Sequence, residues 1–149
     1  MSQQNVELVS GLQPPPGTDL ALLFRDDATW EAAREALAGL FDPECESAIV
    51  MPGDGDAAAR RTYRGVDGLR QAWLDWLQPW ESYQFQIERV IDAGERVVVL
   101  SRDRGRHRDM DVEVESPVAA IWAVRSGRVS RAEFYASREQ ALEAAGLRE

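Results

Sequence analysis

The chain contains no lysine, one cysteine and one histidine among its 149 residues. A lone Cys45 forms no internal disulfide, and His107 without a cysteine pair offers too few ligands for a zinc site. We therefore expect no metal and no cofactor. The sequence also lacks any apolar run near the roughly 20 residues of a membrane-spanning helix, so no membrane partner is expected.

Arginine supplies all 17 basic residues, which stand against 26 acidic ones and leave a net charge of −9. Nucleic-acid binding requires a basic surface that neutralises phosphates, so we expect no nucleic-acid partner. Residues 1–13 lack the basic start and long apolar stretch of a signal peptide, which favours a cytoplasmic location. The length is that of one domain, and we predict a flexible N-terminal arm, residues 1–17, before a single domain, residues 18–149.

Apolar residues at helical spacing predict three helices in the first half of the chain. They cover residues 19–25, 29–41 and 66–77. The second helix is expected to end where Pro43 disfavours helical geometry in the residue before it. A short C-terminal helix is predicted after Ser137, because Gln140 three residues later completes a capping box.

Alternating apolar and polar residues predict a series of strands in the rest of the chain. A small hairpin is expected from residues 48–51 and 62–64, with a turn at 52–56. Four longer strands follow at residues 83–91, 97–100, 112–124 and 129–135. The polar stretch 101–111 is interpreted as an exposed hairpin tip. The predicted fold class is α+β, with a cone-like curved antiparallel β-sheet meander packed against three N-terminal helices and a short C-terminal helix.

Three short motifs resemble a known family. They are residues 40–44 (Leu-Phe-Asp-Pro-Glu), residues 63–69 before and within the third helix, and residues 127–131 followed by Tyr135. With the order of the elements, they resemble the SnoaL-like branch of the nuclear transport factor 2 fold over about residues 19–146. That family includes polyketide cyclases, ketosteroid isomerases and domains of no known activity. The resemblance implies a cone-shaped fold, and the fold alone does not name a reaction.

The resemblance also implies where catalytic groups of related enzymes would lie. Ketosteroid isomerases carry an Asp general base on the first strand, and this chain has Met51 at the matching position. Their Tyr on the first helix matches Phe24 or Arg25. A thioether takes no proton, so these differences favour a binding domain over an isomerase of that type.

The last strand offers another candidate set. With no bulge in the strand, Arg131, Glu133 and Tyr135 share one face. If that face lines the cavity, Glu133 can act as general base, with Arg131 stabilising an enolate and Tyr135 donating a hydrogen bond. The alternative, which we favour, is that Arg131 and Glu133 form ion pairs on the outer sheet surface. His107 is a third catalytic candidate because its ordinary pKa is near neutrality, with a solvated hairpin tip as the alternative.

Aromatic residues are concentrated on the elements that should enclose the cone, and the chain has five tryptophans. Aromatic walls suit flat, apolar ligands in a cavity between helices and sheet. Core packing is the alternative for some of these residues. The predicted ligand pocket consists of Trp30, Met51, Trp73, Trp122 and Tyr135.

Two classes of function follow. The first is a small-molecule pocket protein, extending to a cofactor-independent isomerase or cyclase that acts on an apolar carbonyl compound, polyketide- or steroid-like, by proton transfer. The alternative is a non-catalytic ligand-binding or dimeric protein-interaction domain. A homodimer is expected in either class, with the strand at residues 117–124 as the interface.

Overall fold

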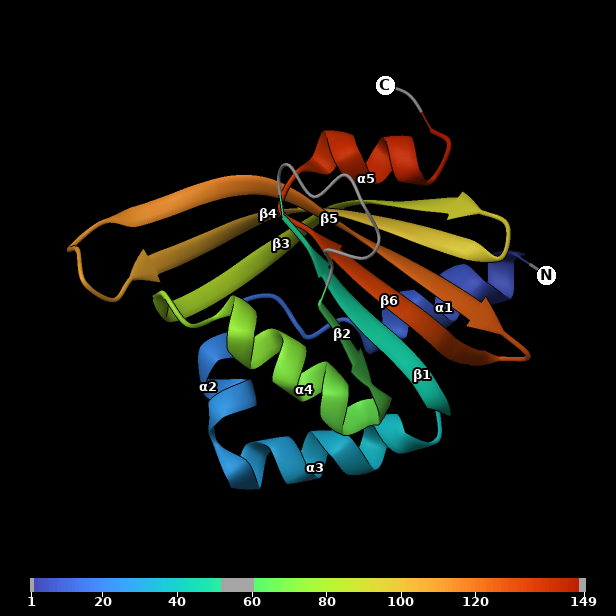
Figure 1. Cartoon of the computed structure of the whole chain (residues 1–149), viewed down its shortest axis with the longest axis horizontal. Helices are drawn as coiled ribbons and strands as arrows, with labels where there is room; N and C mark the ends of the chain where they lie inside the picture. Colours follow the sequence, from blue (N-terminus) through green and yellow to red (C-terminus); the bar gives the residue numbers. More distant parts are fainter. Residues whose placement is uncertain (1, 52–60, 148–149) are drawn as a thin grey trace.

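The computed structural model describes residues 2–51 and 61–147 (Figure 1). The turn predicted at residues 52–56 lies outside these ranges. No helix in the described ranges has the length and apolar character needed to cross a membrane. The helices and strands, in chain order, are α1 (Ser2–Leu12), α2 (Leu20–Arg25), α3 (Asp27–Ala38), β1 (Phe41–Val50), β2 (Arg61–Arg64), α4 (Gly65–Trp76), β3 (Trp80–Ala93), β4 (Arg96–His107), β5 (Glu113–Arg125), β6 (Arg128–Tyr135) and α5 (Arg138–Ala144).

The strands form one curved, open sheet in the order β2-β1-β6-β5-β4-β3. Strands β3 to β6 pair antiparallel as a meander, and β1 joins β6 in parallel. Helices α2, α3 and α4 cover one face of the sheet, whereas α5 lies on the opposite face (Figure 1). The predicted α+β class and cone-like meander are therefore confirmed, with one parallel strand pair that the alternation did not predict.

Short polar side chains cap the N-termini of three helices. The carboxylate of Asp19 accepts a hydrogen bond from the backbone of Ala21, and that of Asp26 accepts one from Thr29. Ser137 caps α5 by accepting from the backbone of Gln140, as the capping box predicted. These caps satisfy backbone N–H groups that have no partner inside the helix.

The second helix is shorter than predicted, because α3 ends at Ala38 and β1 begins at Phe41. Phe41 pairs with Val129 of β6, and its ring lies buried beside Trp122. Burial of this ring against the sheet outweighs the helical spacing that linked it to α3, and the strand runs on through Pro43.

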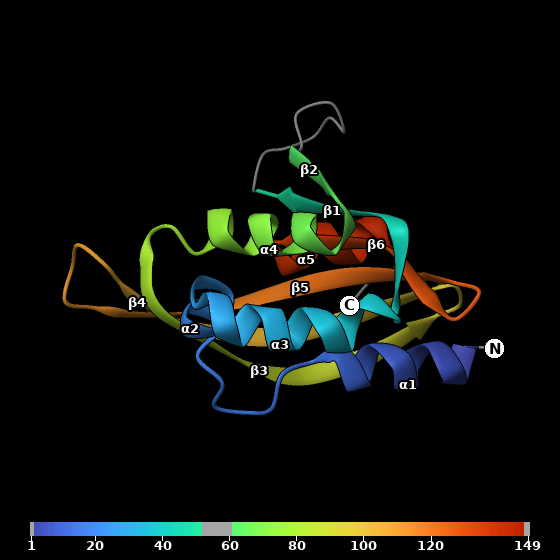
Figure 2. The same ribbon diagram turned by 90° about the horizontal axis from the view of Figure 1, so that it is seen from below.

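The segment predicted as an arm begins with a helix, α1, for which the sequence analysis predicted no regular structure. Val9 is completely buried, and Val6 and Leu12 pack at spacings of three residues on the same core. Asn5 donates a hydrogen bond of 3.2 Å to the backbone oxygen of Gly94 in the β3–β4 turn. Figure 2 shows α1 lying along β3, at the edge of the sheet. The short apolar pattern was weak on its own, and packing against β3 stabilises the helix.

The polar stretch predicted as a hairpin tip is strand as far as His107. Three arginines, at 102, 104 and 106, point to the outer face, where acidic partners pair with them. Ser101, Asp103 and Gly105 alternate with them and point to the concave face. The interpretation as a solvated tip was therefore wrong for residues 101–107, where the alternation of charges reflects the two faces of a strand. It holds for residues 108–111, which lie exposed in the turn between β4 and β5.

Gly68 of α4 is required by its contact with Tyr63. A Cβ at this position would lie 2.8 Å from the backbone carbonyl carbon of Tyr63 and 3.0 Å from its Cβ. We expect Gly68→Ala to lower the free energy of unfolding by about 1–3 kcal/mol through overpacking, despite the better helix propensity of alanine. Urea denaturation measures the change.

Gly11→Ala in α1 is the matched control, since a Cβ there meets nothing within 4 Å. This variant is expected to equal or slightly exceed the wild-type stability. Equal destabilisation by both substitutions would contradict the assignment of the effect to the Tyr63 contact.

Candidate functional site

The concave face of the sheet and helices α2, α3 and α4 enclose a cavity of about 310 Å³. This is about twice the size of a cavity, roughly 150 Å³, that takes up benzene. Residues 12–15, between α1 and α2, close a further side. The wall is mainly apolar, and its aromatic residues include Phe24, Trp30, Trp73, Trp76, Trp122 and Phe134.

Trp73 of α4 lies at the centre of this wall. Its ring stacks on Phe24 of α2 with centroids 5.4 Å apart, and it meets Phe134 of β6 edge to face at 5.2 Å. A third contact joins it to Tyr83 of β3 at 6.3 Å. One side chain therefore connects two helices with both ends of the meander, which gives the cavity a rigid apolar wall.

Asp103 is the only residue with a charged side chain among the described residues that line the cavity. It is 4% exposed, and both carboxylate oxygens accept hydrogen bonds, Oδ1 from the Ser101 hydroxyl at 2.9 Å and Oδ2 from the Tyr83 hydroxyl. Trp76 Nε1 in turn donates to the Tyr83 oxygen at 2.9 Å. A hydrogen-bond chain from α4 through β3 thus fixes a carboxylate inside an apolar cavity.

Burial raises the pKa of Asp103 to about 6. The hydrogen bonds from Tyr83 and Ser101, and the positive charge of Arg138, act in the opposite direction. Burial also raises the pKa of Tyr83, so its phenol keeps its proton at neutral pH and stays a donor. Asp103 is then mainly ionised at pH 7 and titrates just below it, which is the range of an efficient general base.

Three of the five residues predicted for the ligand pocket, Trp30, Trp73 and Trp122, line this cavity. Tyr135 also borders it, but its ring packs on the outer face of the sheet with residues of α5. The Tyr135 hydroxyl donates to Glu133 at 3.1 Å. Met51 is 49% exposed and lies at the end of β1, where it lines a separate groove. Met51, directly after β1, therefore lies outside the cavity.

Glu133 and Arg131 lie on the outer face of the sheet. Glu133 is paired with Ile121, which packs under α5. Arg131 binds Glu46 at 2.7 Å and Glu133 at 3.0 Å. These are the ion pairs of the favoured alternative, and neither side chain is among the described residues that line the cavity. The face was ambiguous in the sequence because the β5–β6 register shifts between Ala123 and Val124.

His107 is the last residue of β4 and pairs with Trp80 of β3. Its ring lies 5.7 Å from that of Trp80, and its Nδ1 accepts a hydrogen bond from the backbone of Asp109 at 3.2 Å. His107 is also not among the described residues that line the cavity. The structure therefore brings none of the three predicted catalytic side chains to the cavity.

Sequence reasoning missed Asp103 and Tyr83. A signal was present, because the arginines at 102, 104 and 106 alternate with Ser101, Asp103 and Gly105. Strand periodicity would extend the buried face of Val97 and Val99 through Ser101 to Asp103. The side chains that bury Asp103 come from other elements, so its burial required the tertiary structure.

Comparison with known proteins supports the same architecture. A model of the SnoaL-like domain matches residues 18–132. A proposed SnoaL-like polyketide cyclase from Jannaschia sp. CCS1 superposes with a TM-score of 0.62 at 18% identity, covering 96% of this chain and 91% of that one. TerC, crystallised with polyporic acid, gives 0.59 at 18% identity over 96% of this chain and 98% of that one.

A nuclear transport factor 2-like protein of unknown function from Burkholderia pseudomallei is also similar, with a TM-score of 0.60 and 14% identity, covering 94% of this chain and 95% of that one. No protein with a curated description matches the sequence. At these identities the structural likeness extends to the fold alone.

The raised pKa of Asp103 predicts a pH dependence of stability. The pKa of the Asp103 carboxyl group rises from its usual value of 3.8 to about 6 in the folded protein. Between these two pH values the folded protein keeps a proton on Asp103 that the unfolded chain has released. The stabilisation is thus full below pH 4 and is lost as pH rises through 6, a change of about 3 kcal/mol. We expect the difference in unfolding free energy between wild type and Asp103→Asn to change by about this amount between pH 3 and pH 7.

Urea unfolding of both proteins across this pH range measures the difference. Both proteins contain all the other titrating groups, so the contributions of these groups cancel in the difference between the two unfolding free energies. A difference that is flat with pH would show that Asp103 titrates normally in the folded protein.

Proposed function

The chain belongs to the SnoaL-like domain family, and we propose that it binds a small, mainly apolar ring compound in the cavity and that Asp103 accepts a proton from it. Domains of this family often bind small molecules or cyclise polyketides. The observation that carries the proposal is the buried carboxylate of Asp103 in a cavity lined by apolar and aromatic side chains. Such a group is costly to bury and is typical of a functional site.

Size and wall chemistry support a flat ligand. The cavity has the volume of a small-molecule site, at the lower end of the usual range of about 300–1,000 Å³. The rings of Trp73, Phe24 and Phe134 offer faces and edges for stacking. Structural neighbours were crystallised with trimethylamine and with polyporic acid, so the fold accommodates different small molecules.

The proposed chemistry is a cofactor-independent isomerisation or cyclisation of a polyketide- or steroid-like carbonyl compound. The Asp103 carboxylate removes a proton from the carbon beside the carbonyl group. In an isomerisation it returns the proton to another carbon of the enolate system; in a cyclisation the enolate carbon attacks a second carbonyl carbon, and the proton goes to the alkoxide formed there, so no net oxidation occurs in either case. Ser101 and Tyr83 hold the carboxylate in one orientation. The apolar wall excludes water, which would otherwise solvate the base. Asp103 thereby takes the role first considered for Glu133.

Non-catalytic binding is the second candidate, and one observation favours it. Enolate formation needs a donor for the carbonyl oxygen, and neither the Ser101 nor the Tyr83 hydroxyl is available, because both donate to Asp103. In a non-catalytic protein, the Asp103 carboxylate accepts a hydrogen bond from a hydroxyl or other donor of the ligand, and no reaction follows.

A ligand titration separates the two candidates. We expect flat, apolar carbonyl compounds to quench tryptophan fluorescence saturably at micromolar concentration in the wild type, because Trp30, Trp73 and Trp76 line the cavity. If the protein is an enzyme, Asp103→Asn should bind but lose turnover by about 10²-fold or more.

Glu133→Gln is the matched control, with the same carboxylate-to-amide change on the outer face. It should retain both binding and turnover. Saturable binding with no proton exchange in any compound would support the binding candidate. Loss of turnover in Glu133→Gln alone would return catalysis to Glu133, and no quenching by any compound would contradict the pocket.

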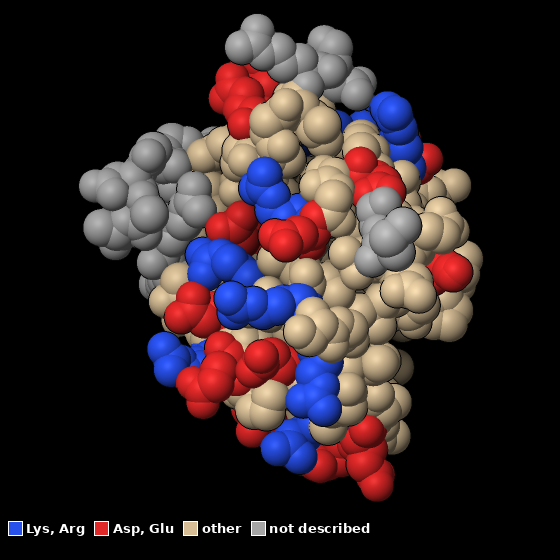
Figure 3. Space-filling model, turned by 90° about the vertical axis from the view of Figure 1, so that its right-hand side faces the viewer, with Lys and Arg blue, Asp and Glu red and all other residues tan. Residues whose placement is uncertain are grey.

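We also propose a homodimer, but not through residues 117–124. The structure buries Ala119 and Ile121 with the residues of α5, and Val118 and Trp122 at the cavity. An exposed surface remains on the outer face of β4 and β5, where Arg104 pairs with acidic side chains. Figure 3, which views the molecule from the right-hand side of Figure 1, shows arginine and acidic groups mixed on that side as well. A face of mixed charge can complement itself about a twofold axis.

Analytical ultracentrifugation at micromolar concentration is expected to give the mass of two chains. Arg104→Glu places like charges together and should shift the equilibrium towards monomer, while Arg34→Glu, on α3, should leave it unchanged. A wild-type monomer at these concentrations would contradict the dimer.

A further inference from the structure

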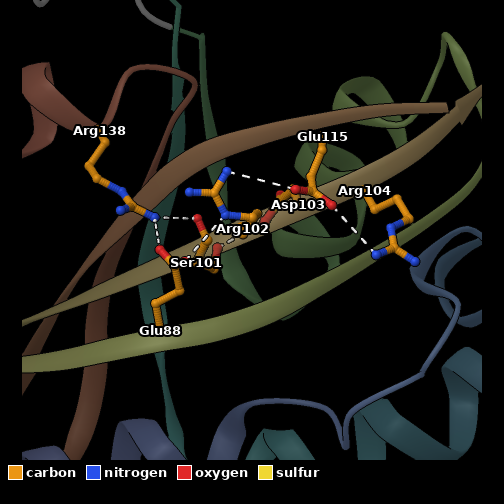
Figure 4. Close-up of polar contacts among 7 residues, drawn as sticks. All are labelled: Glu88, Ser101, Arg102, Asp103, Arg104, Glu115 and Arg138. Atoms are coloured by element: carbon orange, nitrogen blue, oxygen red, sulfur yellow. Dashed lines mark hydrogen bonds and ion pairs between the residues drawn. The ribbon is translucent and has the colours of Figure 1, made fainter.

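Arg138 connects the outer helix α5 with the strand that carries Asp103. Its Nη2 donates to the backbone oxygen of Ser101 at 2.7 Å and to Glu88 Oε1 at 2.7 Å. Figure 4 shows Arg138 directed towards these two residues. The Ser101 hydroxyl on the other face donates to Asp103 Oδ1 at 2.9 Å. A single residue of β4 thus links the guanidinium with the cavity carboxylate.

Part of the Arg138 guanidinium is buried in an energetically unfavourable way. Its Nε is one of two buried side-chain nitrogens with no hydrogen-bond partner in the part of the chain that the structure describes. A buried donor without a partner loses its hydration and gains nothing in return. Such exceptions are rare in native proteins and call for an explanation. An arginine that served only to attach α5 would do so more favourably with its fork exposed to water.

We propose that Arg138 is a positioning residue for the cavity acid, fixing β4 at Ser101 and supplying across the sheet the positive charge that favours the ionised carboxylate. This inference rests on the role of Asp103 in the proposed function. Arg138 lies on the face opposite the cavity and touches no ligand there. It acts on Asp103 by holding the backbone of Ser101 and by the electrostatic effect of its positive charge.

The groups around Asp103 support this role. Tyr83 from β3 donates to the carboxylate, and α4 contributes only Trp76, through Tyr83. At the start of α2, Asp19 accepts from the backbone of Tyr83, which adds no positive charge. The positive charge of Arg138 lowers the pKa of Asp103 against the effect of burial. Without it, burial is opposed by hydrogen bonds alone.

Glu88 and Arg102 complete the local charge balance. Glu88 binds Arg138, and Arg102 binds the same carboxylate at 3.3 Å from the exposed outer face. Glu88 has a lowered pKa because both arginines donate to it, so it stays ionised across the range where Asp103 titrates. Of these two carboxyl groups, it is therefore Asp103 that titrates near pH 6. Arg102 also provides a control that removes one positive charge from the same cluster.

The test is a carbon-detected NMR titration of the Asp103 carboxyl group in the full-length protein without ligand. The wild type should titrate near pH 6. In Arg138→Gln the midpoint should rise by about half a pH unit or more, a threefold change in proton affinity. Arg102→Gln should move it by less than half as much, because water screens its charge.

Arg138→Lys keeps the charge but cannot hold Ser101 and Glu88 with a planar fork, so a smaller upward shift is expected. If Arg138→Gln fails to fold, Arg138→Lys becomes the test, and an unshifted midpoint in Arg138→Lys overturns the proposal. An unshifted midpoint in folded Arg138→Gln, or an equal shift in Arg102→Gln, overturns it as well. If the midpoint shifts as expected but no compound binds, the proposed function fails and the role of Arg138 stands.

Discussion

The packing of Trp73 against the concave sheet is the contact on which the cavity depends. This one ring stacks on Phe24 and meets Tyr83 and Phe134 at their edges. It therefore holds α4 and α2 at a distance from the sheet that the aromatic side chains set. Curvature of the long strands leaves space beside these rings, and the aromatic wall keeps that space apolar.

A carboxylate in such a space is unstable unless it is held, and the chain satisfies Asp103 from both sides. Tyr83 and Ser101 donate to it directly, and Arg138 approaches the strand from the outer face. The result is an acid whose pKa of about 6 reflects a balance between burial and these partners. That balance explains why one residue can serve either as a base or as a ligand-binding acceptor, depending on what lies opposite it.

Much of the fold followed from local patterns. The third helix came from Trp73 and Trp76 at helical spacing, and α5 from Ser137 and Gln140. The aromatic residues of the pocket were named for the same reason, since large rings on the inner faces of helices and strands must meet. Local patterns misplaced the boundary at Phe41, where pairing with β6 outweighed helical spacing.

The sequence by itself determined the element types, the α+β class and the aromatic character of the cavity, because these depend on periodicity and composition. The tertiary structure alone decided which polar side chains face the cavity. A register shift in β6 turned Glu133 and Arg131 outward, and only the contact of β4 with Tyr83 and the helices made Asp103 a buried acid. A local pattern gives the face of a strand side chain only where no bulge intervenes, and desolvation depends on residues distant in the chain.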